Sequence, residues 1–539
     1  MSSSVTPPQP HSEPSAPAGT SPRSAAHGAA APAAHSPSSA DFDRKGANAA
    51  LSALLIGFFM ILVDQTIVTT AMPAIMRGLQ TDINGVVWVS SAYLLAYAVP
   101  LLITGRLGDR FGSKRMYLAG LTLFTLASLW CGLAPDIGQL ILARVFQGLG
   151  AALMSPQTMA IIARVFPPAH RGAAMGVWGA TAGVATLVGP ILGGVLVDWF
   201  GWEWIFFVNV PVGAFAFWMA WRRVPALSTS RHAFDWLGVG LSAVGMFLLT
   251  FGIQEGKTHD WGSILGPITI PMVIAAGVLV MAAFVFWQSR NRREPLMPLR
   301  LFRTRNFALG NAAIFFVGLF ITSMPLPVMI YMQNVRGMTP TQAALMMAPM
   351  AVVSGVLAPF VGRRLRTARP GTYAAFGAGM NGLGMLLYAF TMAADTPIWW
   401  FLVVSAVMGV GSGFMWSPLS TGMSSSLAPH ETGAGSGVYN AIRQSGAVLG
   451  SAVVAVLMES NIARELEGLG TRGGAHAQQT GGEGALMGGT LPEMLHGPFS
   501  TALGHSLIVP AGAALAAAFI AAFMNRGHLD RGDLDRARR

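Results

Sequence analysis

Residues 51–73 read LSALLIGFFMILVDQTIVTTAMP, an apolar stretch that contains a single acidic residue, Asp64. A helix of about 20 apolar residues is long enough to cross the hydrocarbon core of a bilayer. A carboxylate at that depth is costly unless it is paired, protonated or in contact with water, and such residues are usually functional. Asp64 is therefore the first candidate for a functional site.

Apolar stretches of similar length recur along the 539 residues, of which 53% are hydrophobic and only 11% are charged. Soluble proteins carry roughly 25% charged residues, and transmembrane strands would show a two-residue alternation that these stretches lack. The sequence therefore predicts an all-α integral membrane protein with fourteen transmembrane helices. Their predicted spans are 50–73, 86–105, 116–134, 138–160, 172–197, 203–221, 235–255, 265–288, 307–332, 341–362, 371–393, 397–423, 434–457 and 504–525.

The positive charges predict how these helices are oriented. The 34 Lys and Arg give a net charge of +11, and most of them fall in loops on one side of the predicted helices. Both termini lie on that side, because the number of predicted helices is even. Since Lys and Arg are enriched on the cytoplasmic side, we expect both termini in the cytoplasm and the protein in the cytoplasmic (inner) cell membrane. Topology accounts for the charge, so we expect no nucleic-acid partner.

Two segments of the sequence repeat. Residues 171–190 align without gaps on residues 432–451, and the loop at 105–115 resembles residues 359–369. The fifth predicted helix then corresponds to the thirteenth and the second to the tenth, which is the pattern of two related six-helix halves with two helices inserted between them.

From this pattern we predict five regions: a disordered cytoplasmic tail at 1–47, an N-terminal six-helix bundle at 48–225, two inserted helices at 226–295, a C-terminal six-helix bundle at 296–527 and a cytoplasmic tail at 528–539. The second bundle includes a long extracytoplasmic loop at 459–503. Its glycine-rich sequence fits either an ordered hairpin or a flexible lid, and we expect it to be flexible.

Several motifs follow in order along the first half. The loop 105–115 reads GRLGDRFGSKR, residues 144–150 read RVFQGLG, residues 189–194 read GPILGG and residues 202–211 read WEWIFFVNVP. Together with DQTIV at 64–68, these motifs resemble the major facilitator superfamily, in its fourteen-helix drug:proton antiporter branch. The resemblance covers about residues 50–525 and implies two six-helix halves around a central cavity.

Arg144 is predicted to lie within the fourth membrane helix, where an arginine needs a partner. Its expected depth matches that of Asp64. Burial raises the pKa of a carboxyl group, whereas a nearby cation lowers it. A carboxylate that alternates between these surroundings can bind and release a proton at physiological pH. We therefore assign Asp64 and Arg144 to proton coupling, and a static salt bridge is the alternative.

The loop at 105–115 is the candidate for a conformational latch, formed by Gly105, Asp109, Arg110, Gly112 and Arg115. Glycines permit a tight turn and a close approach between helices. The Asp109 carboxylate can accept hydrogen bonds from the N-terminus of a facing helix, which the resemblance implies is the thirteenth. The alternative is a solvated turn that only sets the topology.

A candidate antiporter motif lies on the fifth helix, and it consists of Gly189, Pro190, Gly193 and Gly194. Small residues allow membrane helices to pack closely, and proline permits a bend. The link to antiport is implied by the resemblance, and ordinary tight packing explains the same residues.

The family resemblance also implies a substrate cavity between the halves. Candidate substrate-binding residues are Trp88, Tyr93, Tyr97, Gln147, Asn311, Phe315, Phe316, Met346, Trp416, Tyr439 and Arg443. Arg443 either forms a structural pair or faces an anionic substrate. Asp64 is the only acidic residue deep in any predicted helix, so we expect lipophilic monovalent, neutral or zwitterionic substrates rather than dications. A cationic substrate and a proton would then compete for Asp64.

The sequence contains no phosphate-binding Gly-Lys-Ser/Thr loop, and no metal-ligand grouping stands out. We therefore expect no enzymatic activity, no cofactor and no metal. The predicted function is proton-coupled export of small lipophilic drugs or toxic metabolites by a monomer whose partners are the substrate, protons and the lipid bilayer. The alternatives are dedicated export of one endogenous metabolite or lipid, and a membrane sensor or scaffold on the same fold.

Overall fold

The structure is a computed structural model, and it describes residues 43–524 apart from 228, 230–234, 257, 292–294, 366–368, 425–426, 428–431, 474–490 and 492. The predicted tail at 528–539 and most of the predicted tail at 1–47 lie outside these residues. Asp43 caps the first helix, because its side chain accepts a hydrogen bond of 2.9 Å from the backbone N–H of Gly46. The first helix therefore begins at Arg44, earlier than predicted.

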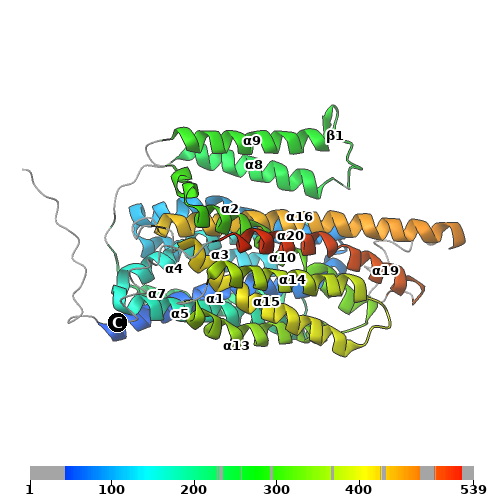
Figure 1. Cartoon of the computed structure of the whole chain (residues 1–539), viewed down its shortest axis with the longest axis horizontal. Coiled ribbons are helices and arrows are strands. Elements are labelled where there is room, and N and C mark those ends of the chain that lie inside the picture. Colours follow the sequence, from blue (N-terminus) through cyan, green and yellow to red (C-terminus); the bar gives the residue numbers. More distant parts are fainter. Residues whose placement is uncertain are drawn as a thin grey trace, which may run out of the picture. The chain divides into compact units, whose positions relative to one another are not determined.

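Helices make up nearly all of the described chain (Figure 1), as the composition predicts. They are α1 (Arg44–Leu79), α2 (Ile83–Phe111), α3 (Ser113–Gly132), α4 (Ile137–Val165), α5 (Pro168–Phe200), α6 (Trp204–Phe207), α7 (Asn209–Arg223), α8 (Trp236–Gln254), α9 (Ile270–Arg290), η1 (Leu299–Arg303), α10 (Arg305–Ser323), α11 (Pro325–Ile330), η2 (Tyr331–Val335), α12 (Pro340–Met346), α13 (Ala348–Arg364), α14 (Pro370–Thr391), α15 (Ile398–Ser424), α16 (Thr432–Gly473), α19 (Glu493–His505) and α20 (Ile508–Ala522).

Eleven helical segments in the described part of the chain are long and apolar enough to cross a membrane. Helices α3, α5 and α14 were predicted to span but are not among the eleven. Several predicted spans are interrupted. The span at 203–221 divides into α6 and α7, the span at 307–332 into α10, α11 and η2, and the span at 341–362 into α12 and α13. Pro325 and Pro349 lie in the first turns of α11 and α13, where a proline is tolerated because no helical N–H is needed.

A small hairpin precedes α9, where the sequence predicts a helix from residue 265. Strands β1 (Ser263–Leu265) and β2 (Ile268–Thr269) pair antiparallel, and the turn between them contains Gly266 with φ of +56°. Glycine and proline at 266–267 favour a turn over a helix. The predicted start of this helix is therefore wrong by five residues, since α9 begins at Ile270.

The predicted loop at 459–503 is helical at both of its ends. Helix α16 continues to Gly473, and α19 begins at Glu493. Within this loop, only residues 474–490 and 492 lie outside the described part of the chain. The last predicted span, 504–525, is made of the end of α19 and all of α20.

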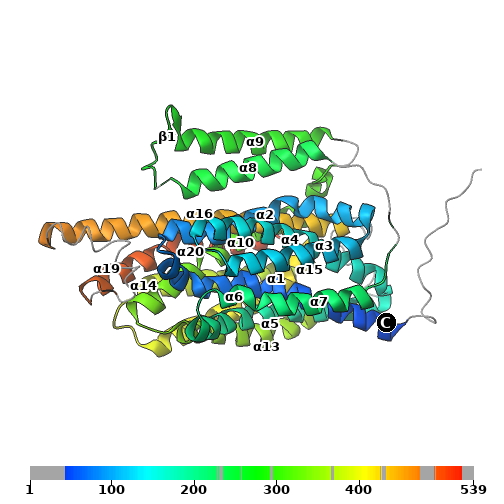
Figure 2. The ribbon, with the colours of Figure 1, turned by 180° about the vertical axis from the view of Figure 1, so that it is seen from behind.

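The helices on either side of the inserted pair make matching contacts. In the first half α1 packs on α5, α2 on α4 and α3 on α4; in the second half α10 packs on α16, α13 on α15 and α14 on α15. The inserted helices α8 and α9 lie side by side (Figures 1 and 2), and α8 also touches α2 and α16.

The two halves meet through α2 with α16, through α5 with α12 and α13, and through α1 with α11 and α12. Three polar contacts can be described between them. Ser91 Oγ lies 2.7 Å from Ser451 Oγ, Gln333 Nε2 donates to the carbonyl of Thr70 at 3.1 Å, and the Thr341 N–H donates to Asp198 Oδ2 at 3.1 Å. All three lie toward the end of the bundle where α1 ends and α2 begins.

Candidate functional site

Asp64 lies on α1 with none of its surface exposed. Arg144, on α4, is 1% exposed and its Nη1 atom lies 2.6 Å from Asp64 Oδ2. The structure thus places in direct contact the two charges whose depths the sequence matched. A buried pair of this kind is retained only if both partners are satisfied, because the desolvation of each ion is costly.

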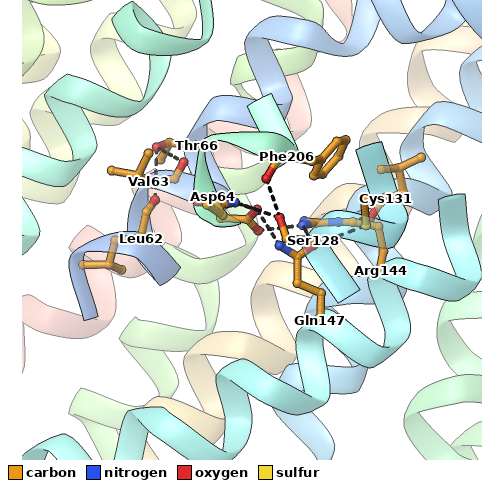
Figure 3. Close-up of polar contacts among 11 residues, drawn as sticks. Leu62, Val63, Asp64, Thr66, Ser128, Cys131, Arg144, Gln147 and Phe206 are labelled. Carbon is orange, nitrogen blue, oxygen red and sulfur yellow. Dashed lines mark hydrogen bonds and ion pairs between the residues drawn. The ribbon is translucent and has the colours of Figure 1, made fainter. Parts of the chain in front are cut away.

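Two neutral amides complete the coordination of the Asp64 carboxylate (Figure 3). Gln147 Nε2 donates to Oδ1 at 2.8 Å, and Asn209 Nδ2 donates to the same oxygen at 3.1 Å. Gln147 Oε1 also accepts a hydrogen bond of 2.7 Å from Arg144 Nη1. The Asp64 carboxylate on α1 is therefore bonded to side chains from α4 and from the start of α7. In each of its own hydrogen bonds the carboxylate is the acceptor.

Further contacts fix the donors in place. Arg144 Nε donates to the carbonyl of Val89 on α2 at 3.2 Å. Asn209 Nδ2 also donates to Ser128 Oγ on α3 at 3.1 Å, and Ser128 donates in turn to the carbonyl of Phe206 at 2.9 Å. The Asp64 cluster, which we define as Asp64, Arg144, Gln147, Asn209 and Ser128, thus joins four helices of the first half.

Aromatic rings cover the Arg144 side of this cluster. The guanidinium carbon lies 4.1 Å from the centre of the Tyr93 ring and 5.8 Å from that of Phe206. Cations are attracted to the faces of such rings, and most strongly where water is excluded. The positive charge of Arg144 is therefore stabilised by Asp64 and by the two aromatic faces.

Helix α5 supports the turn of α1 that carries Asp64. A Cβ atom on Gly189 would lie 1.9 Å from Thr66 Oγ1, and one on Gly193 would lie 2.7 Å from Ile67 Cγ1. Both distances are too short for a side chain, so these glycines are required for the close contact between α5 and α1. Pro190 is half-buried beside them. Close helix packing by itself explains the positions of these residues.

The predicted latch loop contains the turn from α2 to α3. Gly112 has a φ of +97°, a conformation that favours glycine. A Cβ atom on Gly105 would meet only Pro156, at 3.9 Å. Arg110 and Arg115 are exposed, and the side chain of Asp109 lies outside the described residues. The contact of Asp109 with the thirteenth helix stays a prediction.

The model of a transporter family matches most of this chain: residues 54–451 match the Major Facilitator Superfamily. The chain belongs to this superfamily. A transporter of the same type from Mycobacterium tuberculosis, described as uncharacterized, is 48% identical over 88% of this chain and 80% of its own length. The tetracenomycin C resistance and export protein of Streptomyces glaucescens is 32% identical over 89% of this chain and 92% of its own.

A multidrug resistance protein of Mycobacterium tuberculosis is 35% identical over 76% of each chain. Among solved structures, a bacterial homologue of the human lysosomal transporter Spinster, in an inward-facing and unoccupied conformation, covers 90% of this chain and 98% of its own with a TM-score of 0.61 and 16% identity. That likeness shows the fold. The family and these relatives point to a membrane transporter rather than an enzyme.

The superfamily fold places the first-half substrate candidates in different surroundings. Trp88 donates through Nε1 to Glu255 Oε1 of the inserted pair at 2.8 Å. Tyr93 covers Arg144, and Tyr97 donates to Ser155 Oγ at 2.9 Å. Gln147 belongs to the Asp64 cluster and has no exposed surface. Only a different conformation would bring Gln147 to a substrate.

The second-half candidates lie on four helices. Asn311 is buried and donates to the Phe307 carbonyl, while the half-buried rings of Phe315 and Phe316 meet edge to face. The other candidates differ in exposure: Met346 and Arg443 are half-buried, Trp416 is exposed and Tyr439 is buried.

Sequence reasoning missed two members of the Asp64 cluster. Asn209 belongs to the segment 202–211, which carried the family resemblance but no assigned role, and Ser128 carried no signal at all. Cys131 is also buried beside the cluster, and its Sγ lies 3.5 Å from Gln147 Oε1. Neutral polar residues are common in membrane helices, so their types alone do not identify partners.

Proposed function

We propose that this protein is a proton-coupled antiporter that exports small lipophilic compounds, either drugs or toxic metabolites, across the cytoplasmic membrane by alternating access. The observation that carries the proposal is the fully buried ion pair between Asp64 and Arg144 on membrane helices. Ionisable residues at such depth mark ion pathways and proton relays. The relatives that are named for drug resistance and export support the direction and the type of substrate.

The geometry of the Asp64 cluster supports a coupling mechanism. An ionised Asp64 accepts hydrogen bonds from Arg144, Gln147 and Asn209. A proton on one oxygen turns that oxygen into a donor, and Arg144 has no acceptor to offer it. Protonation also removes the counter-charge of Arg144. The two protonation states of Asp64 therefore favour different arrangements of α1, α4 and α7, which is the requirement for a switch between two conformations.

The proposal includes a particular architecture. We propose fourteen spans, arranged as two related six-helix halves and one inserted pair, with both termini in the cytoplasm. The matching contacts of α1 with α5 and of α10 with α16 support the repeat. The loop at 105–115 would act as the latch between the halves.

Transport into inside-out membrane vesicles with an imposed pH gradient tests the proposal. The wild type should accumulate an exported lipophilic drug only with the gradient, and Asp64→Asn should lose this dependence because the asparagine cannot be protonated. Asp136→Asn is the matched control. Asp136 caps α4 through the Gln139 N–H, and asparagine caps helices equally well. Equal gradient-driven accumulation by the wild type and Asp64→Asn would rule out Asp64 as the coupling residue.

A further inference from the structure

We propose that Arg443 binds the negatively charged oxygen atoms of a substrate, so that the protein accepts lipophilic monoanionic acids such as carboxylates. This inference rests on the proposed export function and specifies the class of its substrate.

Arg443 is a charge in a membrane helix, and no partner for it lies among the residues that the structure describes. It is half-buried and lies within the apolar part of α16. In the described part of the chain, its side chain makes no ion pair or hydrogen bond. An arginine at membrane depth without a counter-charge is costly, and such residues face the interior of the bundle or a water-filled cavity rather than lipid. A ligand or water must therefore satisfy its five N–H donors.

Two neighbours of Arg443 also lack hydrogen-bond partners among the described residues. Tyr439 lies one helical turn earlier, and its buried hydroxyl is unsatisfied. Gln444 has no exposed surface, yet neither its amide nitrogen nor its amide oxygen is bonded. A buried polar atom without a partner is destabilising, because it has lost its hydrogen bonds to water and gained none in the protein. The donors of these three side chains match the needs of an oxyanion, which accepts several hydrogen bonds at once.

Helix α2 of the first half lies against this part of α16. Helices α2 and α16 are in contact, and the bond between Ser91 and Ser451 fixes their register. Tyr97 lies six residues after Ser91, while Arg443 lies eight residues before Ser451. The two therefore differ by about 3 Å along antiparallel helices. Tyr97 and Tyr439 both lie near Arg443. The site lies between the halves, where a transported molecule must pass.

Space is available on the same part of α16. A Cβ atom on Gly437 would meet no other atom within 4 Å. Residues 437, 440 and 444 follow the helical spacing of three and four residues, so they share one face. The open position is therefore on the same face of α16 as Gln444, whose amide has no partner among the described residues.

The charges of the two halves decide which substrate fits this conformation. The Asp64 oxygens are occupied by three donors and have no exposed surface. The cationic group of a substrate would have to displace Arg144 to reach them. Among the described residues Arg443 has no bond to break, so an anion binds there without that loss. An arginine fork also binds a carboxylate through two parallel hydrogen bonds.

Binding of two isosteric probes to the purified full chain in lipid nanodiscs tests this assignment. The probes are 1-naphthoate, which is negatively charged, and 1-naphthamide, which is neutral and of similar shape. Quenching of tryptophan fluorescence reports binding. We expect the wild type to bind 1-naphthoate at least tenfold more tightly than 1-naphthamide. Arg443→Gln should abolish the preference, and Arg443→Lys should retain part of it because the charge remains.

Arg336→Gln is the matched control, because Arg336 already donates to the Thr396 carbonyl at 2.6 Å. This variant should keep the preference for 1-naphthoate. Absence of a preference in the wild type, or a preference that survives in Arg443→Gln, would overturn the assignment. If the anion assignment fails but the wild type still exports a neutral drug when a pH gradient is imposed, the proposed export function stands. If export into vesicles does not depend on the pH gradient, the proposed function fails, but anion binding at Arg443 does not.

Discussion

Two arginines within membrane helices, Arg144 and Arg443, have opposite surroundings. Arg144 is almost completely buried and contacts a carboxylate, an amide oxygen, a backbone carbonyl and two aromatic rings. Arg443 is half-buried and, among the residues that the structure describes, has no bonded partner for its side chain. The same residue type therefore serves the internal structure in one half and is available to a ligand in the other. The two arginines therefore differ in whether a counter-charge lies beside them, and not only in their depth in the membrane.

The strongest test of this comparison is to replace each arginine by methionine. Arg144→Met leaves the Asp64 carboxylate buried without its counter-charge, and we expect a loss of about 3–5 kcal/mol in stability. Arg443→Met breaks no bond and removes a costly charge, so its stability should stay within about 1 kcal/mol of the wild type or rise. Unfolding of the detergent-solubilised protein, followed by intrinsic fluorescence, measures both. The double variant Asp64→Leu/Arg144→Met should recover part of the loss, and equal losses in the two single variants would contradict the comparison.

A smaller effect is expected from the glycines near each arginine. Gly189→Ala places a Cβ atom 1.9 Å from Thr66 Oγ1 and 3.2 Å from the Val63 carbonyl, so a rotation of Thr66 cannot relieve both contacts. Overpacking of this kind costs about 1–3 kcal/mol. Gly437→Ala is the matched substitution in the other half, where the new atom meets open space, and alanine should stabilise the helix by up to about 1 kcal/mol. Thermal unfolding that ranks the two variants in the opposite order would show that α5 is not tightly held against α1.

The smallest effect concerns Asp235, a carboxylate that also accepts several hydrogen bonds but lies outside the membrane spans. Burial raises the pKa of Asp235, but hydrogen bonds from Trp287, the Gly238 N–H, Gln288 and Asn291 outweigh this effect, so the pKa lies below its ordinary value. A lowered folded-state pKa contributes stability above the unfolded pKa, and this contribution is lost as the pH falls through the folded pKa.

Asp235→Ala should therefore cost about 1 kcal/mol at neutral pH, as expected for the loss of a helix cap. The difference from the wild type should shrink when the pH is lowered below about 4. Asp235→Asn should lose less, because asparagine also caps helices. Unfolding curves at several pH values check this, and a cost as large as that of Arg144→Met would mean that the number of donors matters more than membrane depth.

The contact between Asp64 and Arg144 was predictable because charges within membrane helices are rare and must be paired. Their depths within the helices left few other combinations. Asn209 was not predictable as a partner, since a neutral amide carries no such obligation and its position depends on the break between α6 and α7. The buried position of Gln147 could not be inferred either, because residue type does not reveal which face of α4 meets α1.

The helical class and the superfamily followed from composition and from motifs in order along the chain. The interruptions within spans were harder to predict, because a helix that breaks for a few residues keeps the same average hydropathy. The hairpin at 263–269 was not predicted for a related reason. Its isoleucines and Leu265 suit a membrane helix as well as a strand, and only the turn at Gly266 separates the two.

The small residues of α5 have a geometric consequence for the way the halves communicate. Gly189 contacts α1 beside the Asp64 turn, and a Cβ atom on Gly194 would lie 2.5 Å from the Thr341 Cα of the second half. Five residues of helix separate these two points, which is about 7.5 Å or one and a half turns. As long as this segment stays helical, the two contacts cannot be altered independently. A displacement of Thr341 relative to α5 is therefore transmitted to the backbone that carries Asp64.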